Sequence, residues 1–270
     1  MGLHKTFYYL MYAVGFALMT VMTLRRCTQK GISKKRGATY TLFTFFGGLL
    51  GAMVMGVIYT AAARSVGLED VSYVAIFGAV IFTPLLLLAA LGLEKRRDPA
   101  VNIPAVMDCI TPGSFTVVIC GKFGCFLYGC CYGVQSAFGI WNPLIGQKVF
   151  PVQLFEVLSM LVILLLLAVL QKRAWWIEGL AYPVTAAIYA AVRFGWEFLR
   201  AYPAPMRHFI FGMTLWQFCC VLVFAVSAAV IACICISSRK ETKILSENKF
   251  SPVAAKEKIP VAGKYTDQPE

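Results

Sequence analysis

Charged residues are scarce in this sequence, and their scarcity excludes an ordinary water-soluble domain. Asp, Glu, Lys and Arg make up only 14% of its 270 residues, whereas apolar residues make up 59%. The mean hydropathy is +0.73. The apolar residues also gather in runs near 20 residues long, which is the length that crosses the hydrocarbon core of a bilayer. The composition therefore predicts an all-α membrane protein with several spans.

Histidine is nearly absent, and the ten cysteines contain no CxxC pair. The two histidines, His4 and His208, lie near the N-terminus and in an expected loop. With these spacings neither a zinc nor an iron–sulfur site is predicted, and we expect no metal or other cofactor. Cysteines inside apolar runs usually pack as small apolar residues. A disulfide between Cys125 and Cys130 or Cys131 stays open.

Seven spans are expected, and the basic residues predict their orientation. The spans lie at about residues 6–24, 40–60, 73–93, 103–128, 153–171, 177–200 and 213–236. The first, third and fifth loops and the C-terminal tail hold 18 of the 25 Lys and Arg residues. The positive-inside rule places these regions in the cytoplasm and the N-terminus outside. The net charge of +12 therefore reports topology and not nucleic-acid binding.

The expected domain organisation follows from the same pattern. Residues 1–238 form a transmembrane domain, and residues 239–270 form a basic cytoplasmic tail that is too polar to be ordered. In the second span, Gly47 and Gly51 have the spacing that lets membrane helices approach closely. The connection at 130–149 is rich in glycine and is expected to be a loop or a re-entrant segment.

The sixth span carries four polar residues on one face. Tyr189, Arg193, Glu197 and Arg200 follow one another at steps of four, four and three, which places them within about 80° of arc on a helix. Charges at membrane depth are costly and usually face a partner or a polar cavity. One alternative is an internal Arg193–Glu197 pair with Arg200 reaching the interface. We favour a polar pocket for a charged ligand.

Polar residues from other spans are expected at the same level, in the outer third of the membrane. Tyr8 opens the first span, Lys122 lies near the end of the fourth, and Gln153 and Glu156 begin the fifth. For Glu156, a favourable interaction with the helix dipole is an alternative. Lys122 stands in a glycine-rich segment that ends at Gly133, and this segment could equally be a helix-packing face. Together these residues predict one shared cavity.

The order and spacing of these motifs resemble those of the bacterial prolipoprotein diacylglyceryl transferase family. The similar segments are YYLMYAVGF at residues 8–16, GKFGCFLYGCCYG at 121–133, PVQLFE at 151–156, the pattern of Tyr189, Arg193, Glu197 and Arg200, and GMTLWQ at 212–217. The resemblance covers all the expected spans. It implies transfer of a diacylglyceryl group from phosphatidylglycerol to the cysteine thiol of a lipoprotein precursor, in the bacterial cell membrane.

The resemblance also assigns roles to the residues. It implies that Arg193, Lys122 and Glu197 are catalytic, with the two cations stabilising the departing phosphate. It further implies that a set of neighbouring residues binds the substrates: Tyr8, Tyr189, Arg200, Gln153, Glu156, Gly133 and Cys125. The expected partners are phosphatidylglycerol, the precursor's lipid-box region and the bilayer.

The sequence departs from the family pattern at several of these positions. Lys122 replaces an arginine, Cys125 an asparagine and Cys130 a glutamate, and the family's histidine in the third span is missing near Phe77. The missing histidine leaves no obvious base for the thiol. One alternative is therefore a relative that binds anionic phospholipid without transfer. Another is a small transporter, which Asp108 alone in the inner half of the membrane supports only weakly.

Overall fold

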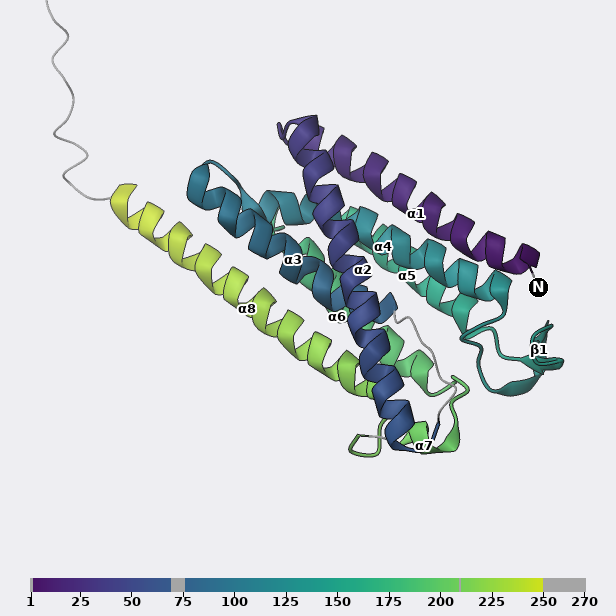
Figure 1. Cartoon of the computed structure of the whole chain (residues 1–270). Coiled ribbons are helices and arrows are strands. Elements are labelled where there is room, and N and C mark those ends of the chain that lie inside the picture. Colours follow the sequence, from purple (N-terminus) through teal and green to yellow (C-terminus); the bar gives the residue numbers. More distant parts are fainter. Residues whose placement is uncertain (1, 69–75, 209, 250–270) are drawn as a thin grey trace, which may run out of the picture.

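The computed structural model describes residues 2–68, 76–208 and 210–249, which form a bundle of helices with a small β-hairpin at one end (Figure 1). In chain order the elements are α1 (Gly2–Gln29), α2 (Lys34–Ser65), α3 (Ile76–Arg97), α4 (Ile103–Tyr128), β1 (Gln135–Asn142), β2 (Gln147–Val149), α5 (Val152–Leu170), α6 (Ala181–Glu197), α7 (Ala204–Arg207) and α8 (Leu215–Lys249).

Six helices in the described part of the chain are long and apolar enough to cross a membrane: α1, α2, α3, α4, α5 and α8. The sixth expected span corresponds to α6, which has 17 residues. At 1.5 Å per residue this is about 26 Å, slightly less than the roughly 30 Å of a bilayer core. The structure thus supports a polytopic membrane protein, whereas the seventh span and the orientation remain predictions.

The bundle is built from close helix pairs. Helix α1 lies along α4, and α2 crosses α3 (Figure 1). At that second crossing Gly51 meets Gly78, and a Cβ atom added to Gly51 would lie only 2.3 Å from the Gly78 carbonyl oxygen. The sequence prediction of a close approach at Gly51 is therefore confirmed. Only residues without a side chain permit this contact between two backbones.

The beginning of α6 is fixed by Asp108 of α4. The Asp108 carboxylate accepts hydrogen bonds from the backbone N–H groups of Gly179 and Ala181, each at 3.0 Å, and from the Trp176 indole N–H at 3.3 Å. These bonds satisfy free N–H groups at a helix N-terminus. Helix α6 consequently begins later than the expected residue 177.

The connection at 130–149 differs from the expectation of a purely helical protein. It forms an antiparallel hairpin, in which β1 pairs with β2 through Trp141 and Lys148 among others. Gly139 passes so close to β2 that an added Cβ would lie 2.5 Å from the Val149 carbonyl. The glycines that suggested an irregular loop therefore permit a tight hairpin, and the fold is helical with a small sheet.

Several expected boundaries shift. Helix α8 continues to Lys249, well beyond the expected end of its span at 236. The beginning of the third span at residue 73 and the tail residues 250–270 lie outside the described residues. The N-terminal end of α1 and the hairpin lie at one end of the bundle, and the C-terminal end of α8 lies at the other (Figure 1).

Candidate functional site: a buried ion network beside three cysteines

The centre of the site is Glu156, in the second turn of α5 and 1% exposed. Its Oε2 atom lies 2.8 Å from Nζ of Lys122 and 2.7 Å from Nη2 of Arg200, and its Oε1 atom lies 2.9 Å from Nη1 of Arg193. Glu156 therefore joins cations from three separate segments. The alternative of a simple helix-dipole role does not describe this position.

A second carboxylate, Glu197, completes the network. It forms an ion pair with Nη1 of Arg193 one turn earlier on α6, and its Oε2 atom lies 3.7 Å from Nε of Arg200. The expected Arg193–Glu197 pair is thus present, but it is only part of a larger cluster. All five residues are at most 4% exposed, so no charge of this cluster reaches outward as a snorkelling residue would.

Arg200 reaches the cluster by a route that the helical stripe did not predict. Helix α6 ends at Glu197, and Arg200 follows a short turn and pairs with Gly133 as an isolated β-bridge. A Cβ added to Gly133 would lie 2.6 Å from the carbonyl oxygens of Leu199 and Phe150. Gly133 therefore lets the backbone that carries Arg200 pass beside the hairpin.

Two residues that the sequence analysis did not select support Glu197. The Tyr202 hydroxyl donates a hydrogen bond to Oε1 of Glu197, and the Thr214 hydroxyl lies 3.5 Å from the same oxygen. Thr214 belongs to the 212–217 motif that contributed to the resemblance, whereas Tyr202 stood in a Pro-containing loop. The feature of the sequence that could have indicated Tyr202 is its position two residues after Arg200.

Neither of the two expected tyrosines belongs to the network of ion pairs. Tyr189 is buried one turn before Arg193 and packs against Phe77 and Phe115. Its hydroxyl makes no hydrogen bond within the described residues. Tyr8 of α1 is half-buried, contacts Tyr128 at a ring-centroid distance of 5.9 Å and packs over the last turns of α4.

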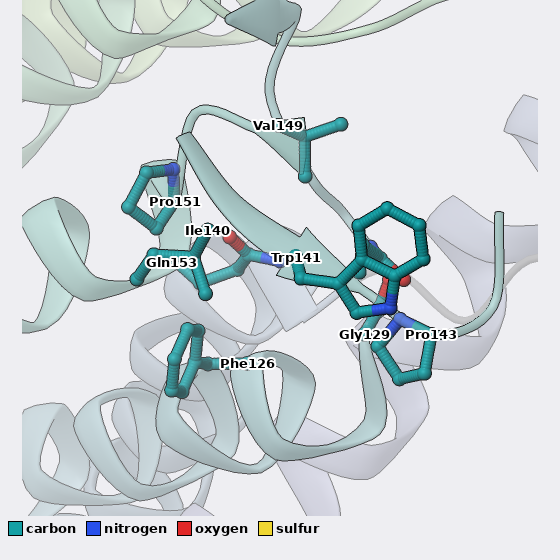
Figure 2. A pocket seen from close by; sticks show the side chains of 9 residues that line it. Phe126, Gly129, Ile140, Trp141, Pro143, Val149, Pro151 and Gln153 are labelled. Carbon is teal, nitrogen blue, oxygen red and sulfur yellow. The ribbon is translucent and has the colours of Figure 1, made fainter. Parts of the chain in front are cut away.

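Gln153 lies one turn before Glu156 on α5 and contacts the cysteine turn. Its Nε2 atom donates a 2.6 Å hydrogen bond to the Cys130 carbonyl oxygen, and its Oε1 atom has no hydrogen-bond partner among the described residues. Gln153 lines a small cavity of about 70 Å³. Figure 2 shows it among the other lining residues, which include Phe126 of α4 and Ile140 of β1. One face of Gln153 thus borders open space.

Three cysteines meet where α4 ends. Gly129, with φ +87°, caps the helix, and Cys131 follows with φ +59°. This turn brings the sulfur atoms of Cys125, Cys130 and Cys131 within 4.8 Å of one another. Across the described residues they form no disulfide. The sequence contains no CxxC pair and so does not predict this cluster, which forms only because the chain reverses at a left-handed cap.

The cysteine cluster adjoins the ion network. Hydrogen bonding to Cys125 and Cys130 holds the pKa of the Cys131 thiol well below its ordinary value, and the positive charges of Arg200 and Lys122 lower that pKa further. Cys131 is therefore the thiol of the cluster that ionises most readily.

The charges of the network do not cancel. Three cations, Lys122, Arg193 and Arg200, face two carboxylates, Glu156 and Glu197. In addition, the Nε atoms of both arginines donate no hydrogen bond within the described part of the chain. A buried excess of positive charge with free donors is unfavourable unless an anion accepts them. The arrangement is suited to binding a phosphate group.

Comparisons with known proteins point in the same direction. A model of the family described as prolipoprotein diacylglyceryl transferase matches residues 1–233. A protein of Clostridium perfringens named phosphatidylglycerol–prolipoprotein diacylglyceryl transferase 2 is 28% identical over 218 residues, which cover 75% of this chain and 81% of that protein. Phosphatidylglycerol–prolipoprotein diacylglyceryl transferases of two Dehalococcoides mccartyi strains are 30% identical over 134 residues, or 46% of this chain and 49% of theirs.

Proposed function

Because the chain belongs to the prolipoprotein diacylglyceryl transferase family, as its motifs predict, we propose that it transfers a diacylglyceryl group from phosphatidylglycerol to a precursor's lipid-box cysteine. The observation that carries this proposal is the positive charge excess of the network around Glu156. Phosphatidylglycerol presents one negative phosphodiester, which this excess would balance.

The reaction is a displacement at the glyceryl carbon by the thiolate of the precursor. The carbon–oxygen bond to the phosphate breaks, and glycerol phosphate leaves with the bonding electrons. Negative charge therefore grows on the phosphate oxygen in the transition state, and buried cations stabilise such charge most effectively. Arg193 is our candidate for this role, with Lys122 as the second cation.

The carboxylates and the neutral residues would then position these cations and the substrates. Glu156 and Glu197 both pair with Nη1 of Arg193, which holds the guanidinium at that nitrogen and leaves Nε available. Arg200 would add a further donor. Tyr8, Tyr189 and Gln153 would contact the head group, and Gly133 and Cys125 would border it. Lys122 supplies a point charge without the two-pronged geometry of an arginine.

The proposed location is the bacterial plasma membrane, with the network near its outer face. The network lies where α4 ends and α5 begins, beside the hairpin. The basic loops predict that this end faces outward. Both phosphatidylglycerol and the translocated precursor would be available there.

A second candidate is a relative that binds anionic phospholipid and transfers nothing. The substitution that favours it is the loss of the family's histidine near Phe77, because this loss removes an evident base for the thiol. The ion network itself is compatible with either function, since both require a phosphate site.

A transfer assay separates the two candidates. Proteoliposomes containing the full chain would receive phosphatidylglycerol labelled in its glyceryl and acyl groups, together with a precursor peptide that has a lipid-box cysteine. We expect a thioether-linked lipopeptide from the wild type and none from Arg193→Ala. Arg96→Ala, at an exposed position on α3, is the matched control and should remain active.

The same assay can also reject the transferase. The Clostridium perfringens relative is tested in parallel under the same conditions. If the wild type retains labelled phosphatidylglycerol but forms no lipopeptide, the transferase is rejected and the binding protein is favoured. A peptide with serine in place of the cysteine excludes transfer to other groups.

A further inference from the structure

The three-cysteine cluster has the composition of a metal site with an open position. Cys125, Cys130 and Cys131 place three sulfur atoms within 4.8 Å of one another, and the group includes no fourth His, Cys, Asp or Glu of the described residues. Zinc bound by thiolates is tetrahedral, with Zn–S distances of about 2.3 Å and hence sulfur–sulfur distances of about 3.8 Å. A closure of at most about 1 Å would bring the sulfurs to these distances.

The surroundings of the cluster suit such an ion. The adjoining ion network has three cations against two carboxylates, and nearby positive charge favours the thiolate form of cysteine ligands. Two contacts also fix the turn that carries the cysteines. Gln153 donates a hydrogen bond to the Cys130 carbonyl, and Gly133 forms a β-bridge with Arg200. Cys130 and Cys131 are only half-buried, so a ligand can approach them.

We propose that Cys125, Cys130 and Cys131 bind a zinc ion whose fourth position takes the thiol of the incoming precursor. This inference rests on the proposed transferase function and names the group that activates its nucleophile. Three protein ligands with an open fourth position are typical of catalytic zinc, and a thiol that coordinates zinc is deprotonated. The ion would thus activate the thiol in place of the family's histidine, which is missing near Phe77.

The precursor S–H loses its proton on binding zinc, and its sulfur forms a bond to the glyceryl carbon of phosphatidylglycerol. The carbon–oxygen bond to phosphate breaks, and the released thiol proton balances the second negative charge of the departing glycerol phosphate. No oxidation occurs, and the zinc remains Zn²⁺ throughout.

Metal content tests the site itself. The full chain, purified under reducing conditions and equilibrated with zinc, should hold one zinc per chain by elemental analysis. Single Cys→Ser variants at 125, 130 and 131 should lose it. Cys120→Ser on the same helix and Cys233→Ser on the exposed face of α8 should retain it. Equal zinc in the triple Cys→Ser variant and the wild type, or no zinc in either, overturns the proposal.

Cobalt replacement tests the fourth position independently of activity. The Co²⁺ form should show thiolate charge-transfer absorption, and the precursor peptide should change that spectrum while its serine counterpart does not. A spectrum that the cysteine peptide leaves unchanged overturns the proposal. Because this measurement uses the wild type, it stands even if a cysteine variant fails to fold.

The pH profile of transfer gives a third readout. A free thiol with a pKa of about 8.5 is only about 3% ionised at pH 7. Zinc-free protein should therefore transfer about 30-fold more slowly at pH 7 and regain most of the rate near pH 9. Full transfer at pH 7 without zinc rejects the zinc site and leaves the transferase intact. Zinc binding with the expected cobalt spectrum but no transfer rejects the transferase instead.

Discussion

The Nζ atom of Lys122 lies 2.8 Å from the Oε2 atom of Glu156, and this buried ion pair joins the last turns of α4 to the second turn of α5. The pair is one of three that converge on Glu156. It shows that the lysine at this position is part of the polar cluster and does not reach outward to the lipid interface. Glu156 is therefore the carboxylate that all three cations share.

Removal of that carboxylate should destabilise the fold. Glu156→Gln leaves three buried cations facing only Glu197, and loss of one partner from a buried ion network typically costs about 3–5 kcal/mol. We expect a clearly lower thermal unfolding midpoint in detergent. Glu178→Gln, which removes an exposed partner of Lys30, should change stability by less than about 1 kcal/mol. Equal midpoints for the two variants would contradict this role of Glu156.

Lys122 should be needed for its charge more than for its shape. Lys122→Met removes one cation from the phosphate site and should lower transfer about 10²- to 10³-fold, the usual effect of losing one such donor. Lys122→Arg keeps the charge and restores the residue typical of the family, so it should retain activity. The measurement is the initial rate of lipopeptide formation. A fully active Lys122→Met would remove this residue from the catalytic set, and Lys148→Met on the hairpin is the control.

The crossing of α2 and α3 should not tolerate any side chain. A Cβ added to Gly78 would lie 2.0 Å from the Gly51 carbonyl oxygen, whereas a Cβ at Gly92 meets nothing within 4 Å among the described residues. We expect Gly78→Ala to cost at least about 1–3 kcal/mol, because the helices must separate. Gly92→Ala should be neutral or slightly stabilising. Comparable unfolding midpoints for the two variants would show that this crossing is not close.

Asp108 should contribute to the stability of the fold and not to the movement of a solute across the membrane. Its carboxylate accepts three hydrogen bonds, from the Trp176 indole and from backbone groups of Gly179 and Ala181. Asp108→Asn removes the charge opposite a helix N-terminus and leaves one or two donors poorly matched, which should cost about 1–3 kcal/mol. The phosphatidylglycerol concentration for half-maximal transfer should not change. A large change in that value with unaltered stability would place Asp108 in the substrate path.

The sequence predicts most of the helices because long apolar runs are a strong signal. The expected fourth span coincides with α4, and the fifth nearly coincides with α5. The ends of α6 are less predictable. Its beginning depends on a hydrogen bond that the Ala181 N–H donates to Asp108, 73 residues earlier in the chain. Its end depends on Gly133, which draws Arg200 into a β-bridge.

The shared depth of the polar residues in the membrane also follows from the sequence, but the ion pairs between them do not. Spacing on α6 and the glycine-rich segment of α4 indicate that Lys122, Arg193 and Glu197 belong together. No local pattern shows that Glu156 is the shared partner, because its position near a helix N-terminus has an adequate local explanation. The cysteine cluster is similarly hidden, since it requires the reversal at Gly129.

The central claim is that the buried positive excess around Arg193 holds the phosphate of an anionic phospholipid. The most direct measurement is retention of phosphatidylglycerol against phosphatidylcholine by purified protein, with native mass spectrometry of the wild type and Arg193→Ala. We predict that the wild type retains phosphatidylglycerol preferentially and that Arg193→Ala loses this preference while remaining folded. Equal retention of both lipids by the wild type, or an unchanged preference in Arg193→Ala, would contradict the claim.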